Sequence, residues 1–314
     1  MEWDVAILGW QAVDIIVPIA ELPIEPGQTQ LVPVIRPEPG AAGNFAIVAR
    51  RLGLQVAPLG IVGNDHYGHF LLQSYASEDI DTSQMGIEDG YDTPLVLVLI
   101  DEAANHAFLP VSEPKMGHIE QWIEPMKRSK VVIVMGYLLI RPDMAELAVK
   151  AVHEACKAGR DVFFDPGPLV PQMDRGALRE IMSLSSVILA NLDEAKMITG
   201  NDDPEVAAQI LCEVNKKCAV VKLGGDGCLV ASKSTGVSHF PGFPVTVRDT
   251  TAAGDSFAAA FARGFIENWS IERITQVANA TGAAAVQKLG SGFEVPTRDE
   301  VMSILKANKV DVTL

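Results

Sequence analysis

Short apolar segments alternate along this chain with longer segments in which apolar residues recur every three or four positions. The short segments are rich in β-branched residues and predict buried strands: "DVAILG", "QVAPLGIVG", "KVVIVMG", "DVFFD", "SVILAN" and "CAVVKLG". The longer segments, such as "PDMAELAVKAVHEACKAG", predict amphipathic helices. Strands that alternate with helices in this way are typical of an α/β protein with a central parallel sheet and right-handed crossover connections.

Two segments break this alternation. Residues 12–38 and 92–112 are strand-like and contain no helical stretch. Antiparallel strands that project from a parallel sheet would form a small second layer, so we expect these segments to be lid insertions in a single domain that spans residues 1–314. The apolar run "PLVLVLI" in the second segment is long for an exposed face, which predicts that two lids pair in a homodimer.

Composition and cysteine usage favour a compact enzyme in the cytoplasm. Hydrophobic residues make up 48% of the chain. The longest apolar run, "VVIVMGYLLI", is too short to span a bilayer and predicts a buried strand. The first residues, "MEWDVAILGW", carry acids where a secretory signal has Lys or Arg. The four cysteines form no CxxC pair, so we expect reduced thiols rather than disulfides or a zinc site.

Charge is distributed very unevenly. Residues 1–114 hold sixteen Asp and Glu but only three basic residues, Arg36, Arg50 and Arg51. Such an acidic region is a poor partner for nucleic acid or an anionic membrane, because both attract clusters of Lys and Arg. Recognition of an anionic small molecule also recruits Arg or Lys. We therefore expect a neutral polyol as the small-molecule substrate, either a free sugar or a nucleoside. Trp10 and Phe45 flank the expected pocket, where they would stack a base, or else belong to the core.

The stretch "RDTTAAGDSFAAAFARGF", residues 248–265, predicts a helix that begins near Ala253 after a run of small residues. The first amides of a helix have no internal partner and lie at the positive end of its dipole, so they bind anions. Asp255 in the first turn is placed to accept a proton from a hydroxyl that attacks a bound phosphoryl group. Alternatively, Asp255 is only an acid favoured by the helix dipole. Asp249 adds a second carboxylate, which needs a cation beside any bound phosphate.

Within this stretch, "DTTAAGDSF" resembles the D-T-x-[GA]-A-G-D signature of the ribokinase-like, or PfkB, family of carbohydrate and nucleoside kinases. Other segments resemble that family over nearly the whole chain: "GWQAVDIIV" its first strand with a substrate-binding acid, "PGAAGNFAIVARRLG" its G-G-x-x-x-N-x-A segment, "GIVGNDHYG" its G-x-D-x-x-G turn, "NLDE" its N-x-x-E motif and "VVKLGGDG" its nucleotide-loop strand. The resemblance implies magnesium-dependent transfer of the ATP γ-phosphoryl group to an alcohol. It also implies a Rossmann-like, three-layer αβα fold with a parallel sheet and a β-sheet lid.

The resemblance also implies roles for individual residues. The catalytic base would be Asp255, and the anion hole would consist of the amides of Ala252, Ala253 and Gly254. Substrate hydroxyls would be held by Asp14, Gly40 and Asn44.

The nucleotide and its metal ions would be held by a second group of residues. Asn191 and Glu194 would organise the magnesium ion and the phosphates, and the nucleotide would be lined by Lys222, Gly224, Gly227 and Asn279. Many members of the family bind a monovalent cation such as potassium. The ligand positions of that cation resemble Asp249, Thr251, Ala285 and Gly290 of this chain. Such a cation would offset the charge of Asp249 beside a phosphate.

Several of these motifs also have purely structural explanations. Asn191 and Glu194 have the spacing of a helix capping box. "KLGGDG" contains Asp-Gly, which favours a hairpin turn. His66 and His69 have the spacing of a metal pair on a helix, but no third ligand is near in sequence, so we expect surface residues.

Other enzyme classes lack their motifs in this chain. The P-loop pattern and the protein-kinase set are absent, and no GxGxxG follows the first strand. A catalytically idle sugar or nucleoside sensor of the same fold is a further alternative, although such a protein would be expected to have lost Asp255 or the small residues before it. We therefore predict a sugar kinase, with a nucleoside kinase as the alternative substrate class.

Overall fold

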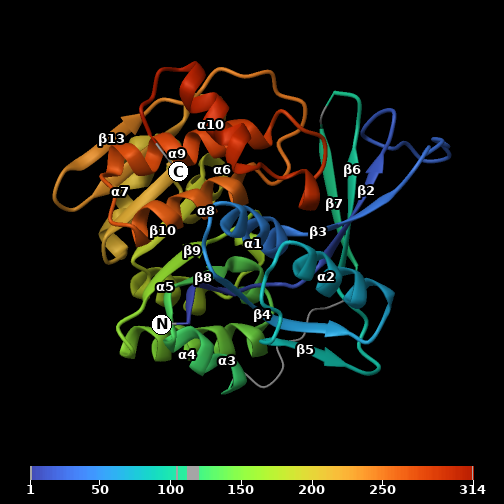
Figure 1. The fold of residues 1–314 in the computed structure, drawn as a ribbon, viewed down its shortest axis with the longest axis horizontal. Coiled ribbons are helices and arrows are strands. Elements are labelled where there is room, and N and C mark those ends of the chain that lie inside the picture. Colours follow the sequence, from blue (N-terminus) through green and yellow to red (C-terminus); the bar gives the residue numbers. More distant parts are fainter. Residues whose placement is uncertain (1, 104, 112–119, 313) are drawn as a thin grey trace.

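The computed structural model describes residues 2–103, 105–111, 120–312 and 314. Within them, nine strands form one sheet in the order β13-β12-β11-β10-β9-β8-β1-β4-β5 (Figure 1). Their bounds are β1 (Trp3–Leu8), β4 (Val56–Gly63), β5 (Met85–Glu88), β8 (Ser129–Met135), β9 (Asp161–Asp165), β10 (Val187–Asn191), β11 (Cys218–Lys222), β12 (Cys228–Ser232) and β13 (Gly236–Phe240). The strands from β5 to β11 in this order pair in parallel, and β12 and β13 extend the sheet antiparallel.

Helices cover both faces of the sheet, each against its own apolar core. One core joins the sheet to α1 (Ala41–Arg51), α2 (His66–Ser77), α8 (Ala253–Ile266), α9 (Ile271–Ala285) and α10 (Arg298–Ala307). The other joins it to α3 (Glu120–Lys127), α4 (Pro142–Lys157), α5 (Arg175–Leu184), α6 (Leu192–Thr199) and α7 (Pro204–Val214). The central strands are apolar on both sides because each side meets helices. The predicted three-layer α/β fold with a parallel sheet is confirmed.

A second sheet of four strands stands at one side of this body (Figure 1). Its order is β3 (Arg36–Pro39), β2 (Val13–Pro18), β6 (Leu95–Ile100) and β7 (His106–Val111). The four strands lie in the two segments predicted to form the lid, except that β3 extends one residue further, to Pro39. Residues 104 and 112 of these segments lie outside the described residues. The expectation of an antiparallel lid is wrong for the central pair, because β2 and β6 are parallel. Only strands joined by a hairpin must be antiparallel, and a long crossover separates these two.

Two further sequence predictions can be compared with the fold. The run 131–140 is not one strand: β8 ends at Met135, and Gly136–Leu139 form a 3-10 turn where the chain leaves the sheet. Helix α8 begins at Ala253, as predicted, and buries Phe257 and Phe261 one turn apart.

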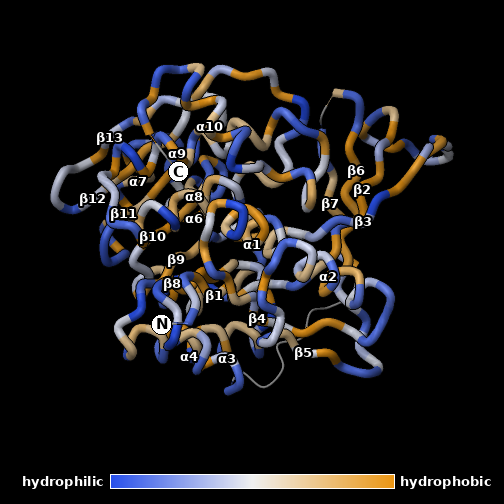
Figure 2. Tube along the Cα trace, in the orientation of Figure 1, coloured by the Kyte–Doolittle hydropathy of each residue, from blue (hydrophilic) through white to orange (hydrophobic). Residues whose placement is uncertain are grey.

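Figure 2 shows the core strands and the lid strands β2 and β6 as hydrophobic segments. None of the helices in the described part of the chain is long and apolar enough to cross a membrane.

Candidate active site

A cavity of about 720 Å³ opens where the parallel strands β8 to β11 end, between the body and the lid. Parallel α/β sheets bind ligands at this edge because the loops after the strands converge there. The cavity brings together most of the residues singled out in the sequence. Those that line it are Asp14, Asn44, Asn191, Glu194, Lys222, Gly224, Gly227, Thr251, Ala252, Ala253, Gly254, Asp255 and Asn279.

The start of helix α8 forms one wall of the cavity. Ala252, the residue before the helix, has a φ of 61°, a left-handed conformation that costs a non-glycine residue about 1–2 kcal/mol. The first two residues of the helix, Ala253 and Gly254, line the cavity. The amide of Ala253 makes one long bond, 3.3 Å, to the Thr250 carbonyl. The wall is therefore a helix N-terminus with no large side chain in front of it, which suits a phosphate.

Asp255 lies in the first turn of α8 and faces the cavity. Its Oδ2 accepts a hydrogen bond of 3.0 Å from Asn44 Nδ2 of helix α1. Burial and the nearby charge of Asp165 raise the pKa of Asp255 to about 7, although the Asn44 hydrogen bond and Lys222 oppose this shift. A carboxyl group with a pKa near neutrality is suited to accept a proton at physiological pH.

Lys222, at the end of β11, brings a positive charge to the helix N-terminus. Its ammonium lies 3.1 Å from Asp165 Oδ2, and a Cβ atom on Gly254 would lie 3.2 Å from the same nitrogen. Burial lowers the pKa of Lys222, but the charges of Asp165 and Glu194 outweigh burial and raise it. The ammonium therefore stays protonated beside the amides that begin α8.

Further residues of the cavity wall, next to Lys222, are those expected to hold a nucleotide. Asn191 and Glu194 form a complete capping box at the start of α6, with three hydrogen bonds of 2.8 Å between them. Burial raises the pKa of Glu194 to about 7, although Lys222 opposes this shift. Asn279 donates to the carbonyls of Phe240 and Pro241 and so holds the loop after β13. The pair thus forms the helix cap that its spacing predicts, and it also lines the cavity.

The "KLGGDG" segment is both a turn and part of the cavity wall. It connects the antiparallel strands β11 and β12, with a 3-10 turn over Gly224–Asp226. Gly224 and Gly227 line the cavity. His66 and His69 lie exposed on α2, as predicted.

The lid side of the cavity holds Asp14, which is on the lid strand β2. Asp14 is 8% exposed, and its Oδ2 accepts a hydrogen bond of 3.3 Å from Ser291 Oγ. Burial and the charge of Asp255 raise its pKa to about 7. Gly40 does not line the cavity but lies directly behind Asp14, because a Cβ at Gly40 would lie 2.8 Å from Asp14 Oδ1. Of the three residues predicted to hold substrate hydroxyls, Asp14 and Asn44 line the cavity and Gly40 does not.

Aromatic residues in the cavity differ from those expected. Trp10 lines it and packs against Tyr137, with ring centroids 5.5 Å apart. Phe45 is fully buried in the core on the inner face of α1 and does not reach the cavity. Of the two alternatives stated for Phe45, stacking on a base or a place in the core, the structure shows the core.

Asp249 lies just outside the cavity, behind the start of α8. Its carboxylate is fully buried and accepts hydrogen bonds from Thr251, from the Gly290 amide at 2.7 Å and from His106 Nε2 at 2.7 Å. Burial raises the pKa of Asp249, but these hydrogen bonds outweigh burial and hold it below its usual value. Ala285 is nearby at the end of α9, where its carbonyl accepts from the Lys288 amide.

Three residues of the site were not predicted from the sequence. Asp165 is the last residue of β9, "DVFFD", at the carboxyl ends of the parallel strands, and this position was a usable signal. Tyr137 enters the cavity because β8 ends earlier than its apolar run. His106 comes from lid strand β7 and contacts Asp249 across 143 sequence positions, so no local pattern could have identified it.

Comparison with known proteins connects this geometry with a family. Residues 13–298 match the family described as pfkB family carbohydrate kinase. The chain is 31% identical over 286 residues to probable fructokinase-2 of Arabidopsis thaliana, covering 85% of this chain and 86% of that protein. It is 27% identical over 275 residues to ribokinase of Haemophilus influenzae, covering 85% and 87%. The structure of a putative ribokinase II from E. coli in complex with ATP and Mg²⁺ superimposes with a TM-score of 0.82 at 24% identity, covering 97% of this chain and 99% of that one.

Proposed function

This chain belongs to the pfkB family of carbohydrate kinases and is a phosphotransferase with an alcohol group as acceptor, and we propose that it transfers the γ-phosphoryl group of ATP to a hydroxyl of a neutral sugar. The observation that carries this proposal is the meeting of Asp255, Lys222 and the first amides of α8 in one cavity. A base, a cation and an anion-binding helix end are the groups that phosphoryl transfer needs.

In the proposed reaction, Asp255 accepts the proton of the acceptor hydroxyl as its oxygen bonds to the γ-phosphorus. The bond between the γ-phosphorus and the β,γ-bridging oxygen breaks, and ADP leaves with that electron pair. The amides of Ala252, Ala253 and Gly254, together with Lys222, stabilise the charge on the transferred phosphoryl group. Asn44 holds the Asp255 carboxylate by its hydrogen bond of 3.0 Å. Asp14 and Asn44 bind acceptor hydroxyls, and Gly40 leaves the space that Asp14 occupies.

Nucleotide and magnesium are proposed to bind beside Lys222, on the side of Asn191 and Glu194. Asp165, Glu194 and Asp255 face a single ammonium group, that of Lys222, so a divalent cation fits the charge balance of the cavity. Within the described chain, no three His, Cys, Asp or Glu side chains are placed to hold a metal by themselves. Mg²⁺ commonly takes most of its ligands from phosphates and water. We propose that Asn191 and Glu194 orient that hydrated ion, which neutralises the phosphates.

The nucleotide itself is proposed to lie along the loop that follows β11. Gly224 and Gly227 line this part of the cavity, and Asn279 supports the wall behind them through the carbonyls of Phe240 and Pro241.

The acceptor half of the cavity supports a neutral substrate. Lys222 is the one Lys or Arg among the described residues that line the cavity, and it is paired with Asp165. Arg36, the basic residue of the lid, is exposed and is not part of the lining. A phosphosugar or sugar acid would bring its extra charge to a region that already contains Asp14 and Asp255. Repulsion there disfavours anionic acceptors.

A nucleoside is the second candidate acceptor. The Trp10–Tyr137 pair places two aromatic rings at the cavity wall, where a base would stack. An idle sensor is disfavoured, because Asp255 and the small residues before it are all present at the cavity.

We propose a potassium site at Asp249, Thr251, Ala285 and Gly290. It is supported by the buried carboxylate of Asp249 behind the anion-binding helix end. We propose that residues 1–314 form one domain and that two copies pair through the lids, whose strand β7 exposes Phe108, Leu109 and Val111. A cytoplasmic location fits the four free cysteines.

An ADP-release screen with ATP and magnesium tests the function. Its panel contains neutral sugars, nucleosides, phosphosugars and sugar acids, each with and without potassium. We expect turnover with a neutral compound and stimulation by potassium. A strong preference for a phosphorylated sugar would overturn the proposal of a neutral acceptor. If no compound of the panel gives ADP release, although ATP binding is shown separately, the idle sensor would be favoured.

A further inference from the structure

The loop of residues 290–295, between α9 and α10, contacts the site from behind. It contains little regular structure beyond a 3-10 turn, Gly292–Glu294. Its first four residues each donate a hydrogen bond to a different residue of the site or lid. These bonds are Gly290 N to Asp249 Oδ2 at 2.7 Å, Ser291 Oγ to Asp14 Oδ2 at 3.3 Å, Gly292 N to Asn44 Oδ1 at 2.7 Å and Phe293 N to Glu38 Oε2 at 3.1 Å.

Asn44 makes this loop relevant to the chemistry. The Asn44 side chain accepts from Gly292 with its oxygen and donates to Asp255 with its nitrogen, so both ends of the amide are held. The position of Gly292 therefore determines how the amide is presented to Asp255. Gly292 has a φ of 56°, and a Cβ there would lie 2.5 Å from Pro39 Cδ. The loop is thus packed tightly against the lid strand β3 at the same point.

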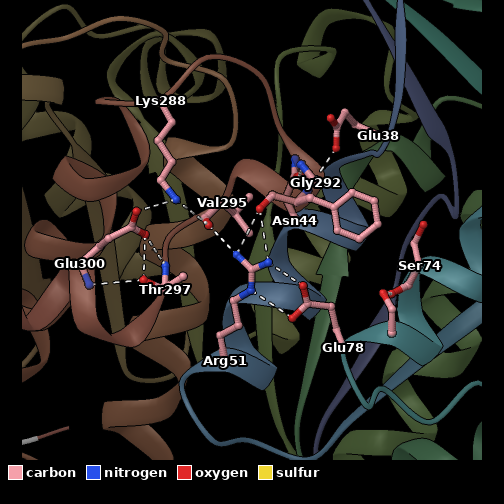
Figure 3. A network of polar contacts seen from close by, with 12 residues as sticks. Glu38, Asn44, Arg51, Ser74, Glu78, Lys288, Gly292, Val295, Thr297 and Glu300 are labelled. Carbon is pink, nitrogen blue, oxygen red and sulfur yellow. Dashed lines mark hydrogen bonds and ion pairs between the residues drawn. The ribbon is translucent and has the colours of Figure 1, made fainter.

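Arg51, the last residue of α1, holds the other side of this loop (Figure 3). Its Nη1 donates to the Val295 carbonyl at 2.6 Å, and both terminal nitrogens donate to the Phe293 carbonyl at 3.3 Å. The guanidinium is oriented by Glu78 of the α2 C-terminus, with hydrogen bonds of 3.0 Å from Nε and 2.5 Å from Nη2. Only a planar fork with several fixed donors satisfies these acceptors together. The Arg51 side chain is 18% exposed and is not part of the cavity lining.

We propose that Arg51 is a positioning residue for phosphoryl transfer, which acts through loop 290–295 on Asn44, and through Asn44 on Asp255, without touching the substrate. This proposal rests on the proposed function for its kinetic consequence, and on the hydrogen bonds above for its structural one. The same loop also holds Asp14 through Ser291. Displacement of the loop therefore disturbs the base and the acceptor site together, while the nucleotide residues on β10 and β11 stay in place.

Variants at Arg51 test the proposal against matched controls. Arg51→Gln removes the fork, and Arg51→Lys keeps the charge alone. Arg50→Gln is the control, because Arg50 lies next to it on α1 and its side chain contacts Asp79, through a hydrogen bond to the carbonyl and an ion pair of 3.8 Å with the carboxylate. Glu78→Gln removes the ion pair but leaves the donors that reach the loop. A role in stability alone predicts similar effects for Arg51→Gln and Glu78→Gln.

The kinetic arm uses the acceptor identified in the screen. We expect Arg51→Gln to lower kcat about 10- to 100-fold, since small displacements of reacting groups have effects of this size. KM for the acceptor should rise several-fold, and KM for ATP should change less than twofold. Arg51→Lys should remain impaired, and Arg50→Gln should stay within about threefold of wild type. Glu78→Gln keeps one acceptor for the guanidinium, so its kcat should fall between those of wild type and Arg51→Gln. Retention of kcat in Arg51→Gln, or an equal rise of both KM values, would overturn the proposal.

Amide hydrogen exchange gives an arm that does not depend on activity. The amides of Gly290, Gly292 and Phe293 should exchange at least about tenfold faster in Arg51→Gln than in Arg50→Gln, at matched global stability. Wild-type exchange rates in Arg51→Gln would overturn the proposal whatever the activity. If exchange accelerates but the wild-type protein phosphorylates no acceptor, the proposed function fails and the role of Arg51 in fixing the loop stands.

Discussion

Replacement of Asp255 by Asn tests the proposed base with the smallest change of shape. The amide keeps an oxygen that can accept from Asn44, so the contact of 3.0 Å is preserved while the proton acceptor is lost. We expect kcat to fall by about 10²- to 10⁴-fold with little change in ATP binding, as for loss of a general base. This range corresponds to roughly 3–5 kcal/mol of activation free energy.

The same substitution should raise the stability of the protein at neutral and alkaline pH, although it lowers activity. The usual pKa of an Asp is 3.8, and that of Asp255 is raised to about 7. The folded state therefore keeps a proton that the unfolded state releases near pH 4, so the free energy of unfolding falls as pH rises from about 4 to 7. The difference amounts to at most about 4 kcal/mol, and less where water in the cavity reaches the carboxylate. The Asp255→Asn variant should escape this penalty.

Urea unfolding at pH 4.5 and pH 8.5, beside the ADP-release assay, measures both effects. The variant should be more stable than wild type at pH 8.5, and most of that gain should disappear at pH 4.5. Asp193→Asn is the control, because Asp193 is an exposed acid in the first turn of α6. Near-normal turnover in Asp255→Asn would refute the base assignment. An equal stability difference at both pH values would refute the raised pKa.

Three more predictions follow from the same contacts. Lys222→Met removes the cation that lowers the pKa of Asp255. We expect kcat to drop at least about tenfold, and the acidic limb of the pH–rate profile, expected near pH 7 in wild type, to move to higher pH. An unmoved limb would contradict the role of Lys222. Gly254→Ala places a Cβ 3.2 Å from Lys222 Nζ, so kcat should fall about tenfold. The higher helix propensity of Ala should raise the free energy of unfolding by up to about 1 kcal/mol. Unchanged kcat would show that the space in front of Gly254 is not needed. Leu109→Ser, on the exposed side of β7, should convert a dimer to a monomer in light scattering, and a monomeric wild type at micromolar concentration would count against lid pairing.

Local patterns in the chain were sufficient to predict the three layers of the main body and the position of Asp255 at the start of α8. Periodicity identified the parallel strands and their helices, because burial on both faces of a strand and on one face of a helix leaves a direct mark on residue type. The start of α8 and the place of Asp255 followed from small residues before an apolar repeat, since a helix end is a local structure. The Asn191–Glu194 cap was predicted for the same reason.

Other features depend on residues far apart in the chain, and only the folded structure places them together. The parallel pairing of β2 with β6 and the contact of lid residue His106 with Asp249 have no signature in any short segment. The electrostatics are decided in the same way, because the pKa values of Asp14, Glu194 and Asp255 depend on burial and on charges brought from other strands. Arg51 looks like an ordinary basic residue at a helix end, and the loop it holds lies more than 240 positions away. Periodicity records which face of an element is buried, whereas the partner that buries it is chosen by tertiary packing.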